Sequence, residues 1–162
     1  GVKAYQSYIM SLIHTAAMTA SSMISKTHFS HQETIEAYTF AIDILKLLYS
    51  DDNVGFYAFD ISYYYNHIAL EYAELKDVGN TLKALEESCR YAIIEANLKD
   101  VNYTAPMVNR MKYTKANTYK NYKGNACNLR LKALEDNKFD LVRNEERFKE
   151  IISDLEKHAE PI

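Results

Sequence analysis

Residues 62–95, SYYYNHIALEYAELKDVGNTLKALEESCRYAIIE, decide the fold. Apolar side chains recur at intervals of three and four residues on both sides of a short polar break at residues 76–79. The two apolar stripes are formed by Ile61, Ile68 and Tyr72, then by Leu82, Leu85, Cys89, Ala92 and Ile93. Because this spacing places apolar residues on one face of an α-helix, the segment predicts two antiparallel helices, over residues 56–75 and 80–97.

The same stretch resembles one tetratricopeptide repeat without a gap. The matching positions are Ile68 and Ala69 for the Leu-Gly pair, Tyr72 for the aromatic residue, and Thr81, Leu85 and Ser88 for the small-large-small pattern of the second helix. Small residues let two helices approach closely, and the large one fills the groove beside them. Lys76 stands where glycine is usual, and Thr81 and Ser88 replace alanines.

A second, more distant copy of the pattern lies earlier in the chain. Thr34, Tyr38 and Ala41 repeat the second-helix positions, but Thr34 and Thr81 are 47 residues apart, more than the period of about 34 of a regular array. We therefore expect an all-α, degenerate tetratricopeptide-like fold. Residues 1–162 would form a single domain, a right-handed superhelix of antiparallel hairpins with about seven helices.

The other expected helices follow from capping and breaker residues. A first helix is predicted over residues 2–26, and a capping box from Ser30 to Glu33 begins the second. Thr104 can cap a fifth helix with Pro106 in its first turn, running to near residue 122. Two shorter helices are predicted over residues 126–136 and 145–158, with Asn144 as the N-cap of the second.

Composition excludes several classes of protein. The chain has 162 residues, a formal net charge of −3, four glycines, two prolines and two cysteines. Two cysteines make no disulfide framework, and the first residues do not show the basic start, apolar core and small-residue cleavage site of a signal peptide. With no apolar run long enough to cross a membrane, we expect a cytoplasmic protein that does not interact with membranes.

The C-terminal half resembles the end of bacterial transcriptional regulators of the Xre (Cro/C1-type helix-turn-helix) family with tetratricopeptide-like domains. The resemblance rests on residues 103–110 (YTAPMVNR), 134–136 (LED), 139–143 (FDLVR) and 147–149 (RFK). It implies an effector-sensing or oligomerisation domain, dimeric, that binds a peptide or other ligand, with DNA contacted only through an N-terminal domain. That domain is not visible here, and the start at Gly1 suggests an excised fragment. The alternative is a stand-alone protein–protein adaptor.

Candidate ligand-binding residues lie where first helices of such hairpins line a concave face. On the first helix of the 62–95 hairpin we expect Tyr63, Asn66 and Leu70 to project into this face. The next concave segment would present Asn109, Arg110 and Tyr113. Tyrosine, amide and guanidinium groups suit the capture of an extended peptide and its carboxylate, although ordinary packing between helices accounts for any one of them equally well.

Charge is unevenly distributed along the chain. Residues 99–132 contain eight basic residues and one acidic residue, so this basic window carries about +7 and the remainder about −10. Its basic residues are Lys99, Arg110, Lys112, Lys115, Lys120, Lys123, Arg130 and Lys132, interleaved with Tyr103, Tyr113, Tyr119 and Tyr122. Either the window is an anion-binding face, or it is a solvated helix held against acidic parts of the fold.

Other features favour neither a metal site nor an enzyme. His28, His31 and Glu33 do not have the spacing of a metal motif, and we expect no cofactor. Cys89 falls on an apolar stripe, whereas Cys127 is expected to be more exposed. No catalytic motif is present, so we expect a binding protein.

The predicted first helix carries a long apolar stripe that includes Tyr5, Ile9, Leu12, Ala16, Ala20 and Met23. Such a stripe completes either a hairpin or the seam of a dimer.

Overall fold

The computed structural model describes residues 1–115 and 120–162, and these are mostly helical. Six α-helices occur in the described residues, together with two short 3₁₀ helices and a two-stranded ribbon. In chain order the elements are α1 (Val2–Ile24), α2 (His31–Leu48), η1 (Gly55–Tyr57), α3 (Ala58–Glu74), α4 (Val78–Ala96), β1 (Val101–Asn102), β2 (Lys112–Tyr113), α5 (Ala126–Ala133), η3 (Asn137–Val142) and α6 (Glu146–His158). The expected all-α fold is confirmed.

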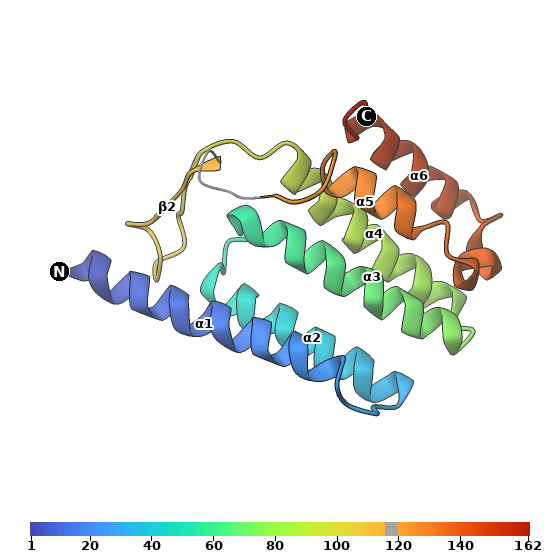
Figure 1. Ribbon diagram of the computed structural model, residues 1–162, viewed down its shortest axis with the longest axis horizontal. Helices are drawn as coiled ribbons and strands as arrows, with labels where there is room; N and C mark the ends of the chain where they lie inside the picture. Colours follow the sequence, from blue (N-terminus) through green and yellow to red (C-terminus); the bar gives the residue numbers. More distant parts are fainter. Residues whose placement is uncertain (116–119) are drawn as a thin grey trace.

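The helices are stacked in sequence order, with α3 and α4 in the middle (Figure 1). In the hairpin of α3 and α4, small residues of the two helices face each other and form hydrogen bonds. Ser62 Oγ donates to the carbonyl of Ser88, and Ser88 Oγ donates to the carbonyl of Ser62, both at 2.7 Å. Thr81 and Ser88 are buried, as the small positions of the second helix require. The prediction of a tight antiparallel pair over residues 62–95 is therefore confirmed.

In the first hairpin, formed by α1 and α2, helix α1 ends at Ile24, two residues earlier than predicted, and α2 begins at the predicted capping box. Ser30 and Glu33 form the expected capping box, in which Ser30 Oγ accepts from the Glu33 amide and Glu33 Oε2 accepts from the Ser30 amide. The hairpin packs through α2 against α3. At its base His14 Nε2 lies 2.7 Å from the hydroxyl of Tyr49.

The prediction of a fifth helix from Thr104 to near residue 122 is wrong for those residues of this range that the structure describes. Residues 104–115 form turns and strand β2, which pairs antiparallel with β1 in the register Val101↔Tyr113 and Asn102↔Lys112. Thr104 donates its hydroxyl to Asp51 instead of capping a helix. Tyr103, Ala105 and Val108 are buried, and the Tyr103 ring lies 5.1 Å from that of Tyr49. Contacts of this segment with the first hairpin thus outweigh its helical pattern.

The C-terminal elements cover the other end of the stack. Asn125 caps α5, with its side chain accepting from the amides of Cys127 and Asn128. Helix α5 ends at Ala133, earlier than predicted, and the N-cap of α6 is Glu145, not Asn144. Phe148, Ile151 and Leu155 of α6 are buried, at the spacing of an amphipathic helix whose apolar face lies on α4 and α5.

No helix in the described parts of the chain is both long and apolar enough to cross a bilayer.

Candidate functional site

Polar and aromatic side chains on one side of α3 lie close to Arg130 of α5. Tyr63 and His67 are one turn apart on α3, and their ring centroids lie 4.4 Å from each other. Asn66 follows Tyr63 by three residues and is buried. Arg130 of α5 places its guanidinium carbon 5.9 Å from the centroid of the Tyr63 ring. We call these four residues, Tyr63, Asn66, His67 and Arg130, the α3–α5 cluster.

Arg130 reaches the cluster because it occupies the apolar face of its own helix. Ala126, Arg130 and Leu134 recur every four residues, so they lie on one side of the helix. Ala126 and Leu134 are 1% and 2% exposed, and Arg130 between them is 8% exposed. The guanidinium of Arg130 is therefore buried where α5 packs against α3.

Two polar atoms of the cluster are buried without a partner. Within residues 1–115 and 120–162, neither Nη1 of Arg130 nor Oδ1 of Asn66 has a hydrogen-bond partner. Arg130 also takes part in none of the ion pairs found among the described residues. An unsatisfied buried donor or acceptor costs about 1–3 kcal/mol, and more when the group is charged. A bound group that pairs with either atom would reduce this cost.

The positive charge of the cluster resides on Arg130. Burial lowers the pKa of Arg130, although a guanidinium remains protonated at neutral pH. Burial also lowers the pKa of His67, and the positive charge of Arg130 lowers it further. His67 is therefore neutral near pH 7, and its ring stacks 5.1 Å from the Tyr38 ring.

The chemistry of the cluster fits a peptide. An arginine N–H donates to a carboxylate or carbonyl oxygen, and an asparagine Oδ1 accepts from an N–H. A peptide chain carries both kinds of group, and a terminal carboxylate makes the stronger, charge-assisted bond with arginine. Tyr63 is 39% exposed beside them and offers a flat apolar surface.

A carboxyl group with a shifted pKa lies one turn before Tyr63. Burial raises the pKa of Asp60 to about 6. Burial raises the pKa values of the neighbouring Tyr57 and Tyr64, and the negative charge of Asp60 raises them further. The Asp60 carboxyl group therefore gains or loses its charge near pH 6, just below neutral pH.

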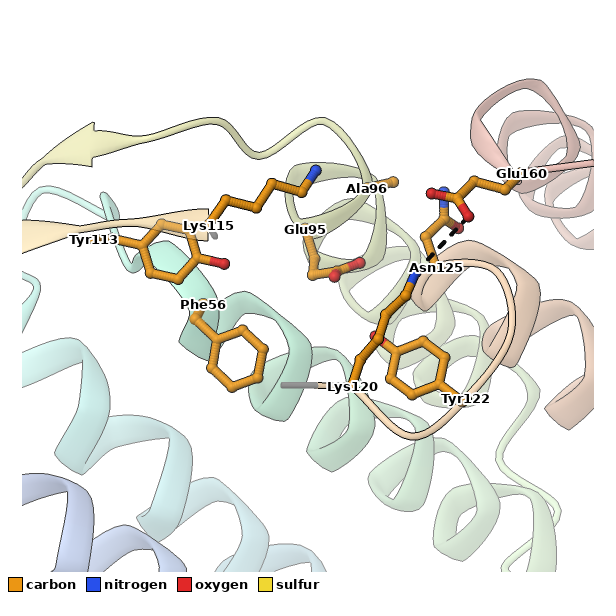
Figure 2. A pocket seen from close by; sticks show the side chains of 9 residues that line it. All are labelled: Phe56, Glu95, Ala96, Tyr113, Lys115, Lys120, Tyr122, Asn125 and Glu160. Carbon is orange, nitrogen blue, oxygen red and sulfur yellow. Dashed lines mark ion pairs between the residues drawn. The ribbon is translucent and has the colours of Figure 1, made fainter. Parts of the chain in front are cut away.

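A second candidate, a cavity of about 160 Å³, lies at the end of the ribbon near α4 and α5. Figure 2 shows Tyr113, Lys115, Lys120 and Tyr122 of the basic window around it, with Phe56, Glu95 and Glu160 on the remaining sides. The Phe56 and Tyr113 rings are stacked at 6.2 Å. Two lysines and two glutamates line the cavity, so its formal charges balance.

The charged groups of this cavity are already engaged within the chain. Lys115 Nζ donates to the carbonyl of Leu98 at 3.0 Å. Lys120 Nζ donates to the carbonyl of Gly124 and lies 3.8 Å from a carboxylate oxygen of Glu160, the ion pair drawn in Figure 2. Glu95 accepts from the amide of Ala126 at 2.9 Å. The α3–α5 cluster is therefore the stronger candidate for binding a ligand.

The six candidate residues from the sequence divide into three places. Tyr63, Asn66 and Leu70 share one side of α3, as their spacing requires. Asn109 and Arg110 lie in the turn between the strands, where Asn109 Oδ1 and the Arg110 amide bind the side chain of Gln6. Tyr113 belongs to β2 and lines the cavity.

Arg130 was not predicted to belong to the site, although it is one of the residues of the basic window. A detectable signal was present, because a charged residue interrupts the apolar four-residue spacing of Ala126 and Leu134. Tyr119, also in the basic window, lies outside the described residues.

The histidine and cysteine residues are engaged in other ways. His31 Nδ1 lies 2.5 Å from Glu71, and Glu33 caps α2. The described residues contain no group of three or more potential metal ligands. Cys127 is fully buried, contrary to expectation, and burial raises the pKa values of both Cys89 and Cys127 to about 12.

Comparisons with protein families, with curated proteins and with solved structures returned no match to this chain.

Proposed function

We propose that this chain is a recognition domain that binds a peptide or protein segment at the α3–α5 cluster. The observation that carries the proposal is that two polar atoms are buried and unpaired, a donor on Arg130 and an acceptor on Asn66. Arg130 would hold a carboxylate of the ligand, and Asn66 would accept from a backbone N–H. Tyr63 would pack against an apolar side chain. Neither cysteine is a thiolate at neutral pH, and we propose binding rather than catalysis.

The wider role we propose is that of the effector-sensing and oligomerisation domain of a cytoplasmic helix-turn-helix transcriptional regulator. Its support is the resemblance in residues 103–110, 134–136, 139–143 and 147–149, together with an architecture of stacked helical hairpins. In a right-handed tetratricopeptide-like superhelix, a ligand joining α3 to α5 would favour one curvature of the stack. That population shift would set the spacing of two DNA-binding heads.

Peptide binding is tested by titration calorimetry with two matched peptide libraries, one with free C-termini and one with amidated C-termini. We expect binding only from the free-carboxylate library, because the arginine bond to a carboxylate is charge-assisted. Arg130→Met should weaken binding by about 10- to 100-fold, the equivalent of one charged hydrogen bond. Lys132→Met is the matched control, since Lys132 lies on the same helix, carries the same charge and is exposed.

Equal binding of both libraries, or equal affinities of the Arg130→Met and Lys132→Met variants, would contradict this site. A domain that binds neither library would contradict peptide recognition through a C-terminal carboxylate.

A stand-alone adaptor would use the same cluster without controlling a promoter. The two roles are separated by the gene from which the chain derives and by a promoter-reporter assay with the full-length product. An upstream helix-turn-helix domain, and a reporter response that Arg130→Met abolishes, would support the regulator. A captured protein partner with no promoter effect would favour the adaptor.

A further inference from the structure

The solvent-facing side of α1 carries a regular seam. Its members are Tyr5, Ile9, Leu12, Ala16, Thr19 and Met23. In the described residues five of its six members are exposed, and the sixth, Ile9, packs partly against the core. The intervals between them alternate between four and three residues, the heptad spacing by which two helices pack along each other. Tyr5 is 75% exposed, Leu12 52% and Met23 51%, so the largest side chains of this α1 seam lie in water.

The charge content of α1 indicates what kind of partner fits the seam. Lys3 is the single Lys, Arg, Asp or Glu residue in the whole of α1. The exposed face of a surface helix ordinarily carries several charges, whereas here it carries alanine, serine, threonine and tyrosine. An uncharged face can meet a copy of itself without repulsion between like charges, a condition that every isologous contact must satisfy.

Side-chain sizes indicate the orientation of that copy. In an antiparallel pair related by a two-fold axis near residue 14, Tyr5 faces Met23 of the partner subunit and Ile9 faces Thr19 of the partner subunit. Leu12 faces Ala16 of the partner subunit, at the layer closest to the axis. Each layer then combines a larger residue with a smaller one, which lets the two helices interdigitate. A parallel pair would instead place Tyr5 against Tyr5 and Ala16 against Ala16.

The dimensions of the helix suffice for a stable contact. Helix α1 has 23 residues, a length of about 35 Å at 1.5 Å per residue. A helix of this length laid along its copy covers on the order of 700 Å² per subunit, close to the roughly 800 Å² of a standard protein interface.

We infer that this chain forms a homodimer through an antiparallel pairing of α1 with α1 of a second copy. This inference rests on the oligomerisation role proposed above. The seam lies on α1 and the proposed ligand site on α3 and α5, so a monomeric chain would overturn the α1 pairing without affecting the ligand-binding proposal.

The interface is tested by sedimentation of the wild-type chain over a concentration series, beside the variants Leu12→Glu and Ser11→Glu. Leu12 lies in the central layer, while the neighbouring Ser11 is also exposed but points away from the seam. We expect a wild-type dimer, an unchanged dimer for Ser11→Glu, and a dissociation constant for Leu12→Glu raised by roughly 30-fold or more. Thr19→Glu, at another exposed seam position, should act like Leu12→Glu, and circular dichroism checks that each variant is folded.

Orientation is tested by oxidative cross-linking of cysteine variants, because the native Cys89 and Cys127 are buried. Positions 5 and 23 are about 27 Å apart along one helix, too far for a disulfide within a chain. In the antiparallel dimer the double variant Tyr5→Cys with Met23→Cys forms a covalent dimer, whereas each single variant does not.

A wild-type chain that stays monomeric throughout the concentration series would overturn the inference. So would a dimer that Leu12→Glu and Ser11→Glu leave equally intact, or a Tyr5→Cys single variant that cross-links to itself.

Discussion

Replacing Arg130 with methionine is expected to make the domain more stable while weakening its ligand binding. Arg130 is 8% exposed and its Nη1 has no hydrogen-bond partner among the described residues. Methionine has a similar length and keeps the apolar contacts of the arginine stem. Removing the unsatisfied charged donor should raise the free energy of unfolding by about 1–3 kcal/mol. Loss of the contact between the guanidinium and the Tyr63 ring costs about 0.5–1 kcal/mol.

The net gain is then about 1 kcal/mol, which corresponds to a rise in Tm of about 2–4 °C for a chain of this size. Thermal and urea unfolding at neutral pH, followed by circular dichroism, measure it, with Lys132→Met as a control expected to stay within about 0.5 kcal/mol of the wild type. A fall in Tm of several degrees for Arg130→Met would show that the guanidinium is well paired in the folded state. That result would refute the reasoning that Arg130 is held ready for a ligand.

Three further substitutions test other parts of the structure. Asp60→Asn should stabilise the fold by on the order of 1–2 kcal/mol at about pH 8 and have little effect near pH 4. Burial raises the folded-state pKa of Asp60 to about 6, so the protonated form stabilises the fold fully below the unfolded pKa, and this stability is lost as pH rises through about 6. Urea titrations at both pH values measure the effect of the substitution. An effect that does not depend on pH would contradict this prediction. Gly55→Ala should lower the free energy of unfolding by about 2 kcal/mol, because Gly55 has a positive φ and an added Cβ would overlap the Tyr103 hydroxyl. Gly79→Ala is the control: Gly79 lies at an open position on α4, so the substitution should be neutral or slightly stabilising. Ser88→Leu should cost about 3 kcal/mol by overpacking the contact with Ser62, and a loss below about 1 kcal/mol in urea unfolding would mean that α3 and α4 can move apart freely.

The two central helices could be predicted because their determinants are local. A stripe of apolar residues at helical spacing, a short polar break and small residues at the crossing lie within residues 62–95. Helix periodicity depends on neighbours three and four residues away, which a sequence displays directly. The capping box of Ser30 and Glu33 is local for the same reason, and the structure confirms it.

The segment after α4 could not be predicted, since its partners are remote in the sequence. Residues 104–110 have a cap residue, a proline in a tolerated position and apolar spacing compatible with a helix. The Pro106 carbonyl instead accepts from Gln6, and Asn109 binds the same side chain. These contacts span about a hundred residues of chain, and local propensity is a weak prior when tertiary contacts of this kind compete with it.

The candidate site shows the same division between local and remote determinants. Sequence alone determined that Tyr63, Asn66 and Leu70 share one side of a helix, and that basic residues gather between residues 99 and 132. Only the tertiary structure decided that Arg130, out of those basic residues, would lie buried against Tyr63, and that Asn109, Arg110 and Tyr113 would lie elsewhere. Helical periodicity specifies the face on which a side chain lies, whereas burial and hydrogen bonding depend on which other helix covers that face.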